Sequence, residues 1–317
     1  HQLGSNDPAR ARSTLRQGIM SVLVVSALLG LVSLAVSPFL PTWLGGNSHI
    51  TPTASAYFAI VATALPIFQF SIFGAGMLRS SGNMVVPSVM SVVMMSLDVV
   101  FNFFLIFPTR LVELFGTQIM MPGMGLGVVG AAIGTVSAEL VAASITMYIL
   151  CFRSKELSLR IDTGRFLPTW GVVKRALHIS LPMGLQQTIM CSAYVMTTII
   201  IAPLGTFAIA ANSFGIIIES LCYMPGYGIA DAATTLVGQS MGAGRHELMK
   251  RFAWLSVGLG VTVMAVMGVV MYVGAPVAMA MMTPAEEVRR LGVEVLRIEA
   301  FAEPMFAAAI VSYGVFV

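Results

Sequence analysis

The chain has 317 residues, of which 57% are hydrophobic and only 10% are charged, and its formal net charge is +3. Soluble domains carry about 25% charged residues, so this chain has too few to cover a water-facing surface. The composition excludes an ordinary soluble protein and predicts that lipid is its solvent. Cys151, Cys191 and Cys222 lie in or beside apolar stretches, without the spacing of a disulfide framework or a metal site.

Eight apolar segments are each long enough to cross a bilayer as a helix, which takes about 20 residues. In chain order they cover residues 14–39, 53–79, 84–107, 126–152, 173–202, 206–237, 247–273 and 290–317. They predict an all-α integral membrane protein, a polytopic helix bundle. Prolines inside several segments are expected to bend the helices, namely Pro66, Pro87, Pro182, Pro225 and Pro304.

Basic residues concentrate in alternate loops. The N-terminal run, Arg79, the 153–175 loop and the 241–251 loop hold all but four of the 17 Lys and Arg residues. Short loops rich in Lys and Arg lie on the cytoplasmic side of a membrane. We therefore expect a multi-pass protein of the inner (plasma) membrane, with both ends of this chain on the cytoplasmic side.

A pair of apolar segments is repeated at a constant interval of 238 residues, without a gap. The identities are Gly4, Gly30, Pro38, Ile60, Ala62, Pro66, Phe68 and Gly76, which recur as Gly242, Gly268, Pro276, Ile298, Ala300, Pro304, Phe306 and Gly314. Such a repeat indicates a duplicated bundle, an arrangement typical of secondary transporters. The interval corresponds to six helices, which predicts twelve helices in two pseudosymmetric six-helix lobes.

Three parts follow from this repeat. Residues 1–152 would form helices 3–6 of an N-terminal lobe, 153–172 a cytoplasmic linker, and 173–317 helices 1–4 of a C-terminal lobe. The chain begins with His1 and ends inside an apolar segment. We therefore expect a fragment that lacks about two helices at each end.

Several short motifs occur in a fixed order along the chain. They are Gly76–Asn83 followed by Pro87, Asp98 with Asn102, Gly125–Thr135, Leu181–Gly184, Asn212, Glu219 with Pro225, Thr234–Gln239, and Gly242–Gly244. In order and spacing they make the chain resemble the multidrug and toxic compound extrusion (MATE) family. The resemblance implies a cleft between two lobes and efflux of drugs or metabolites, driven by protons or sodium ions.

Ionisable residues inside membrane helices are candidates for ion coupling. A charge at the centre of a spanning helix costs about 2.5–3.5 kcal/mol on insertion scales, so it is paired, solvated or functional. The candidates here are Asp98, Glu139, Glu219, Asp231, Glu299 and Glu303. A carboxylate of this kind can take up a proton or coordinate a cation.

In the first lobe we expect a coupling site at Asp98, Asn102 and Thr135. Asp98 and Asn102 lie four residues apart, hence on one helix face, and Thr135 lies among small residues that permit close helix approach. The alternative is a polar patch that is satisfied at a helix interface. The resemblance implies that an Asp on the absent first helix completes this network. In some relatives the Asn and the Asp stand in the opposite order.

In the second lobe we expect Glu219 and Glu303 to couple to the ion. Glu219 precedes Pro225 by six residues, and Glu303 immediately precedes Pro304. The counterpart of Glu303 in the repeat is Leu65, so a purely structural role at both positions is disfavoured. Some relatives carry a cation-binding Glu where this chain has Met190, which favours protons over sodium as the coupling ion.

The substrate cleft is expected to include Gln186, Gln187, Tyr194, Phe68 and Tyr223. The 23 Met residues would suit a pocket for varied apolar cations, although facing lipid or filling space between helices is the more ordinary role for any one methionine. The expected partners are the lipid bilayer and small organic substrates, cationic ones among them, with no nucleic acid, and we expect a monomer.

The sequence thus predicts a secondary active antiporter that works by rocker-switch alternating access. A lipid-linked oligosaccharide flippase of the same superfamily is an alternative, but it would need basic residues in mid-membrane, which this chain lacks. A membrane-embedded enzyme is disfavoured because the sequence has no His-Glu-x-x-His, Gly-x-Ser-x-Gly or Walker motif. We expect no catalytic residues, no metal site and no cofactor, the coupling ion being H⁺ or Na⁺.

Overall fold

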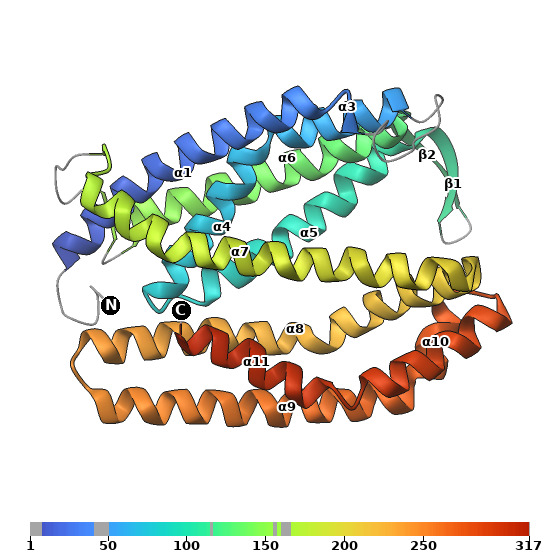
Figure 1. Cartoon of the computed structure of the whole chain (residues 1–317). Helices are drawn as coiled ribbons and strands as arrows, with labels where there is room; N and C mark the ends of the chain where they lie inside the picture. Colours follow the sequence, from blue (N-terminus) through green and yellow to red (C-terminus); the bar gives the residue numbers. More distant parts are fainter. Residues whose placement is uncertain (1–7, 41–50, 115–116, 155–156, 160–165, 317) are drawn as a thin grey trace. The chain divides into compact units, whose positions relative to one another are not determined.

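The computed structural model describes residues 8–40, 51–114, 117–154, 157–159 and 166–316 of the chain. Within them, six helices are long and apolar enough to cross a membrane, and a seventh span is possible if α3 and α4 are counted together across their 45° bend. The prediction of an all-α polytopic membrane protein is confirmed (Figure 1).

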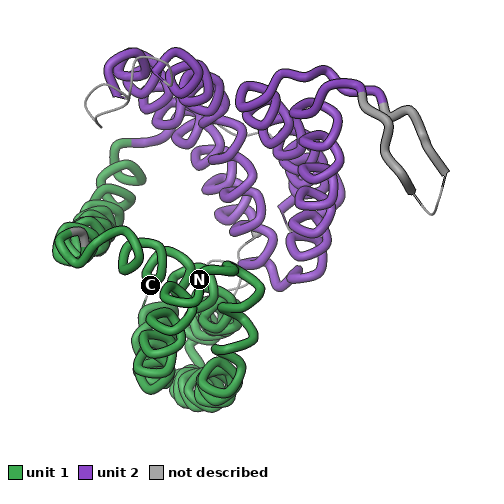
Figure 2. Tube along the Cα trace, turned by 90° about the vertical axis from the view of Figure 1, so that its right-hand side faces the viewer, with its two compact units in different colours: residues 1–6, 170–317 green, residues 7–169 purple. Residues whose placement is uncertain are grey.

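The chain folds as two compact units, coloured separately in Figure 2. Unit 2 comprises Asp7–Thr169, and unit 1 contains Trp170–Val317. It stays a prediction that unit 2 corresponds to helices 3–6 of an N-terminal six-helix lobe and unit 1 to helices 1–4 of a C-terminal one.

Unit 2 is a helical bundle with one short hairpin. Its elements are α1 (Pro8–Val36), α3 (Thr51–Thr63), α4 (Leu65–Ser80), α5 (Val85–Ile106), β1 (Pro108–Leu114), β2 (Thr117–Met124), α6 (Gly127–Tyr148) and the π-helical turn η1 (Ile149–Arg153). The antiparallel pair β1–β2, which the sequence did not predict, joins α5 to α6 and pairs Leu114 with Thr117 next to its turn.

The described part of the expected linker 153–172 is attached to α1 of unit 2. The Arg16 guanidinium donates to the Leu159 carbonyl at 3.3 Å and lies 6.0 Å from the centre of the Phe166 ring. The backbone N–H of Thr169 donates to the Gln17 side chain at 3.3 Å. These contacts hold both ends of the stretch 159–169 against one helix.

The described residues of unit 1 form five α-helices and a short 3₁₀ turn. They are α7 (Trp170–Ile201), the turn η2 (Ala202–Leu204), α8 (Thr206–Gly242), α9 (His246–Met282), α10 (Glu286–Glu299) and α11 (Glu303–Phe316). The side chains of α7 are exposed along almost its whole length.

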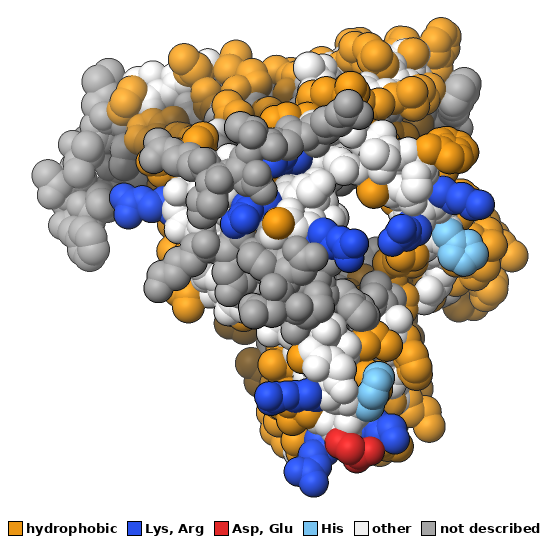
Figure 3. All heavy atoms as spheres, turned by 90° about the vertical axis from the view of Figure 1, so that its left-hand side faces the viewer, with side chains coloured by type: hydrophobic (Ala, Val, Ile, Leu, Met, Phe, Trp, Pro, Cys, Tyr) orange, Lys and Arg blue, Asp and Glu red, His pale blue; other side chains and the backbone are white. Residues whose placement is uncertain are grey.

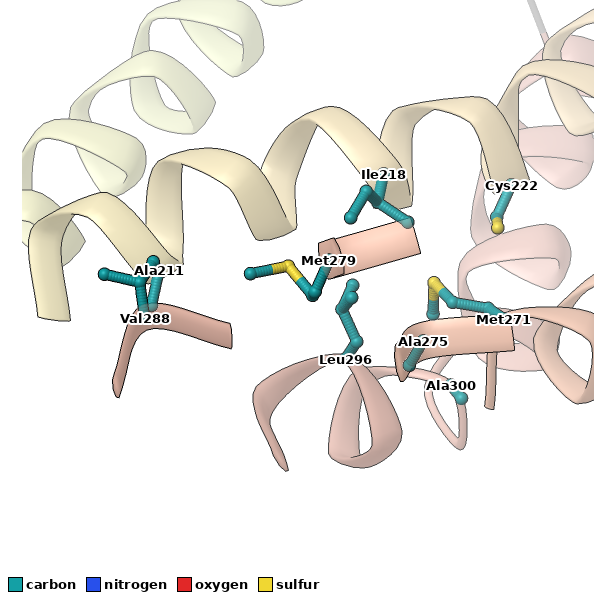
Figure 4. Packing of buried hydrophobic residues seen from close by; sticks show 9 residues of the cluster. All are labelled: Ala211, Ile218, Cys222, Met271, Ala275, Met279, Val288, Leu296 and Ala300. Carbon is teal, nitrogen blue, oxygen red and sulfur yellow. The ribbon is translucent and has the colours of Figure 1, made fainter. Parts of the chain in front are cut away.

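The core of unit 1 is a hydrophobic cluster between α8, α9 and α10, and Figure 4 shows its side chains pointing toward one another. Its members are Ala211, Ile218, Cys222, Met271, Ala275, Met279, Val288, Leu296 and Ala300. Burial of such side chains favours the packed helices by about 25 cal/mol per Å² of apolar surface. α10 contributes to the cluster from one face only and carries Arg and Glu residues on its other faces.

The expected eighth span, 290–317, consists of two helices in the structure. α10 ends at Glu299, and α11 begins at Glu303. Because Pro304 has no N–H, it cannot continue the helical hydrogen bonds, and the turn closes through Ala302 N–H and the Glu299 carbonyl at 2.8 Å. In unit 2, α3 and α4 are separated by a similar break at Ala64, two residues before Pro66.

The two breaks make equivalent contacts, 238 residues apart. A Cβ built at Gly30 would lie 3.0 Å from the Ala62 carbonyl oxygen, and one at Gly268 would lie 2.7 Å from that of Ala300. In each unit, therefore, a glycine without a side chain allows the backbone carbonyl just before the break to lie directly against the glycine's helix. The repeat seen in the sequence is also present in the packing.

Each unit has basic side chains at some of its helix ends, and Figure 3 shows examples in blue. In unit 1 the first turns of α7 carry Lys174 and Arg175, and the start of α9 carries Lys250 and Arg251. In unit 2, one pocket is lined both by the turn that follows α4 and by Arg153 at the end of η1. The ends of α4 and η1 therefore lie close together. The side of the membrane that these ends face stays a prediction.

Candidate functional site

The Glu303 side chain is the most deeply buried carboxylate that the structure describes. Its exposed fraction is 1%, and neither carboxylate oxygen has a hydrogen-bond partner among the described residues. It lies in the first turn of α11, and its Cβ and Cγ pack against Gly268 of α9. A carboxylate in this position is costly unless a proton or a cation neutralises it.

Two further carboxylates belong to the same cluster. Glu299 at the end of α10 and Glu219 on α8 are both half-buried, and the charges of Glu219, Glu299 and Glu303 act on one another. One oxygen of Glu299 is also buried without a described partner. These three carboxylates lie within electrostatic range of one another near the break between α10 and α11, and we call them the acidic cluster.

Aromatic side chains lie beside the acidic cluster. Tyr223 on α8 is half-buried and forms an edge-to-face pair with Tyr227, with ring centres 5.8 Å apart. Tyr194 of α7 is within electrostatic range of Glu219 and Tyr223. Of the expected cleft residues, Tyr194 and Tyr223 therefore lie near Glu219.

The other expected cleft residues lie elsewhere. Gln186 and Gln187 are exposed on α7, where Gln187 donates to the Cys191 sulfur at 3.9 Å. Phe68 is half-buried on α4 of unit 2. Their role in a substrate cleft stays a prediction.

In unit 2 the structure joins Asp98 and Asn102. The Asn102 amide donates to an Asp98 carboxylate oxygen at 3.1 Å, as the spacing of four residues on α5 predicts. The Asn102 carbonyl oxygen is buried, lacks a described partner and lies against Gly134 of α6. Thr135 is the next residue on α6 and is half-buried, without a described bond to Asp98 or Asn102.

The remaining candidate acids differ in burial. Glu139 on α6 is buried, with 8% of its surface exposed, whereas Asp231 on α8 is exposed. Within the described residues, no group of three or more His, Cys, Asp or Glu side chains is arranged to hold a metal ion.

Glu299 is the member of the acidic cluster that the sequence identifies as an ionisable membrane residue but does not predict as a coupling residue. The sequence does contain evidence that sets Glu299 apart. It lies four residues before Glu303, and its counterpart in the repeat is the apolar residue Val61. Both acids thus replace apolar residues of the first copy, on the two sides of the same break.

Comparisons with known proteins agree on one family. The MatE family model matches residues 1–104 and 182–317. The "Probable multidrug resistance protein NorM" of Thermotoga maritima is 28% identical over 72% of this chain and 46% of its own length. The protein of that name from Idiomarina loihiensis is 22% identical over 95% of this chain and 62% of its own length. The chain thus spans about half of the length of these relatives.

Solved structures share the fold. A structure described as a MOP superfamily transporter from Pyrococcus furiosus, whose "reverse polarity of binding pocket suggests different function", aligns with a TM-score of 0.81 and 19% identity. It is matched over 99% of this chain and 70% of its own. A "MATE in the straight conformation" aligns with a TM-score of 0.80 at 18% identity, over 99% of this chain and 69% of its own.

Proposed function

Since the chain belongs to the MatE family, we propose that it forms part of a secondary active efflux transporter. The transporter exports drugs or toxic small organic compounds in exchange for protons or sodium ions. Its curated relatives are described as probable multidrug resistance proteins, which supports the substrate class.

The buried Glu303 carboxylate carries the proposal. An unpartnered charge at 1% exposure is unfavourable, so Glu303 takes up a proton or a cation when it is closed off from water. Because Glu303 begins α11 directly after a helix break, its charge state acts on the hydrogen bonds and packing of that break. Ion uptake is thereby tied to the conformation of the α10–α11 pair.

Alternating access follows from this link. Neutralising the acidic cluster removes the repulsion among Glu219, Glu299 and Glu303 and favours tight packing of α11 on α8 and α9. Losing the ion favours a more open, hydrated arrangement. In a rocker-switch cycle these two arrangements would correspond to opposite openings of the substrate cleft.

Substrate competition is expected at the same cluster. Tyr194 and Tyr223 lie within electrostatic range of Glu219, and a cationic substrate would be attracted both to their rings and to the carboxylate. Substrate and coupling ion would then exclude one another, which is the requirement for antiport.

The test is efflux by the full-length protein reconstituted in liposomes. Asp98→Asn, Glu219→Gln and Glu303→Gln are each expected to lower gradient-driven efflux by about tenfold or more, equivalent to about 1.4 kcal/mol of lost coupling. The control is Glu287→Gln, because Glu287 is exposed in the first turn of α10 and should leave efflux unchanged. Wild-type efflux in all three variants would show that these residues do not couple ion to substrate.

The coupling ion is decided by separate gradients. Proton and sodium gradients are imposed one at a time on the same liposomes, and efflux is followed under each. We expect one of the two gradients to support efflux that Glu303→Gln abolishes, and the sequence favours the proton gradient. Efflux that needs neither gradient would exclude antiport.

A further inference from the structure

A pocket of about 260 Å³ lies between α4, α5 and α6 of unit 2 and is open on the side of the exposed residues Ser91 and Met95. It belongs neither to the acidic cluster of unit 1 nor to the Asp98–Asn102 pair. Its lining includes one carboxylate, three hydroxyls and several apolar side chains. In chain order the lining residues are Ser71, Ala75, Pro87, Met90, Ser91, Met94, Met95, Glu139, Ala142 and Thr146.

Glu139 is the charged group that lines this pocket. It is more than nine-tenths buried, and the structure gives its carboxylate no hydrogen bond or ion pair with any described residue. Glu139, Ala142 and Thr146 follow the i, i+3, i+7 spacing of one helix face, so α6 presents the carboxylate and the Thr146 side chain to the same space. A mostly buried carboxylate that opens into a pocket is neutralised there by a proton or by a cation.

Hydroxyl groups complete a set of oxygen ligands. Thr146 is 2% exposed, and neither its hydroxyl nor that of Ser71 has a partner among the described residues. The Ser91 hydroxyl donates to the Pro87 carbonyl at 3.0 Å, which leaves its own oxygen free to accept or coordinate. Carboxylate and hydroxyl oxygens are the ligands that hard cations prefer.

The charge of the pocket selects a monovalent ion. Its lining contains one carboxylate and neither Lys nor Arg. A cation of charge +1 therefore makes the pocket neutral, whereas a divalent ion would leave an uncompensated buried charge. The volume exceeds that of a bare ion and leaves room for several waters at about 30 Å³ each, so the ion keeps part of its hydration shell.

We propose that this pocket binds a monovalent cation of the sodium type, with oxygens of Glu139, Thr146 and Ser71 as ligands. The site is separate from the Asp98–Asn102 pair but close to it. Leu105 lies against Gly130 and Asn102 against Gly134, so α5 and α6 run antiparallel and the same register places Asp98 opposite Ala138. The Glu139 pocket is therefore a second ion position in unit 2, and it does not depend on the proposed transport activity.

Binding of radioactive sodium to the purified full-length protein tests the proposal. Glu139→Gln keeps the shape of the side chain but removes its charge, and it is expected to lower the number of bound sodium ions by one per chain. Thr146→Val keeps the side-chain shape and removes one ligand oxygen, so it should weaken this site about tenfold, the usual cost of a lost bond to a charged group. Glu287→Gln, on exposed Glu287, is the matched control and should bind like the wild type.

A combined variant distinguishes sodium binding at this site from sodium binding at the proposed coupling residues. In the combined variant Asp98→Asn, Glu219→Gln, Glu303→Gln, one sodium site should remain, and adding Glu139→Gln should remove it. In the same samples, replacing choline chloride by sodium chloride at equal ionic strength should raise the unfolding temperature only where Glu139 is present. Equal sodium binding by the wild type and Glu139→Gln, or no sodium binding by either, would overturn the proposal. So would unchanged affinity in Thr146→Val.

Discussion

Glu303 occupies the position at which the other copy of the repeat has Leu65. Leu65 begins α4 as Glu303 begins α11, and each precedes a proline. A leucine fits the surroundings of this position without any polar partner, whereas the glutamate leaves two buried oxygens without one. The acid therefore costs stability that the scaffold does not require, as is common for residues kept for function.

The free energy of unfolding should rise when this acid is removed. Glu303→Leu deletes a buried polar group that lacks a partner, which is worth about 1–3 kcal/mol, and replaces it with the residue of the equivalent position. We expect a higher unfolding temperature in detergent, measured by intrinsic fluorescence on heating. Glu303→Gln keeps polar atoms at the site, so its unfolding temperature should rise less than that of Glu303→Leu. A lower unfolding temperature for Glu303→Leu would mean that the carboxyl group is held by a stabilising interaction.

Residue-level predictions from the sequence succeeded where the spacing lies within one helix. The Asp98–Asn102 bond needs only the period of α5, and the sequence contains that period. Thr135 depends on the rotation of α6 against α5, which the sequence does not determine, and the structure places Gly134 against Asn102. Glu299 and Glu303 come within electrostatic range of Glu219 through a helix break whose geometry is likewise set by tertiary packing.

At the scale of elements, close approach of helices depends on two glycines at the breaks. Gly268 on α9 faces the Ala300 carbonyl, where a Cβ would lie at 2.7 Å, too near for a carbon atom beside a backbone oxygen. Gly258 on the same helix has open space, with nothing within 4 Å of a built Cβ. Replacing each glycine by alanine changes helix propensity in the same way, but only at Gly268 does it also affect packing. Comparing the two variants therefore separates the two effects.

Gly268→Ala should therefore destabilise the protein, and Gly258→Ala should not. Overpacking against a fixed carbonyl costs about 1–3 kcal/mol, whereas alanine in an open helix position gains about 1 kcal/mol over glycine. We expect Gly268→Ala to lower the unfolding temperature and Gly258→Ala to leave it equal or raise it. Similar shifts for both variants would show that the contact at Ala300 does not limit the approach of the helices.

Element types were largely predictable, and the exceptions have physical causes. Long apolar runs with few charges predict spanning helices, and the structure forms them. The split of 290–317 into α10 and α11 depends on whether Pro304 bends a helix or ends it, which neighbouring helices decide. The hairpin β1–β2 is short, and its local signal is weak because two isolated strands gain little stability by themselves.

At the scale of the whole molecule, the distribution of Lys and Arg predicts which helix ends face the cytoplasm. The turn between α8 and α9 carries basic residues, whereas the stretch from Pro108 to Met124 contains Arg110 as its only one. The structure connects these segments by apolar helices long enough to cross a bilayer. The two segments should therefore lie on opposite sides of the membrane.

Single-cysteine labelling in intact cells measures this arrangement. In a full-length protein whose own cysteines are replaced by serine, Met124→Cys should react with an impermeant maleimide added outside, because Met124 is 71% exposed. His246→Cys, at an exposed position at the start of α9, should react only after the membrane is permeabilised. The reverse pattern would show that the chain is inserted with the opposite orientation.

The shared break at Pro66 and Pro304 has an evolutionary consequence. When a gene segment is duplicated, each copy inherits the same fold, but selection can then act on each copy alone. Glycine and proline occur in both halves, whereas Leu65 and Val61 of the first correspond to Glu303 and Glu299 of the second. Ancestral subunits that paired as identical halves would have carried the same residue at both sites. Fusion into one chain is what allows an acid in one half without a matching acid in the other.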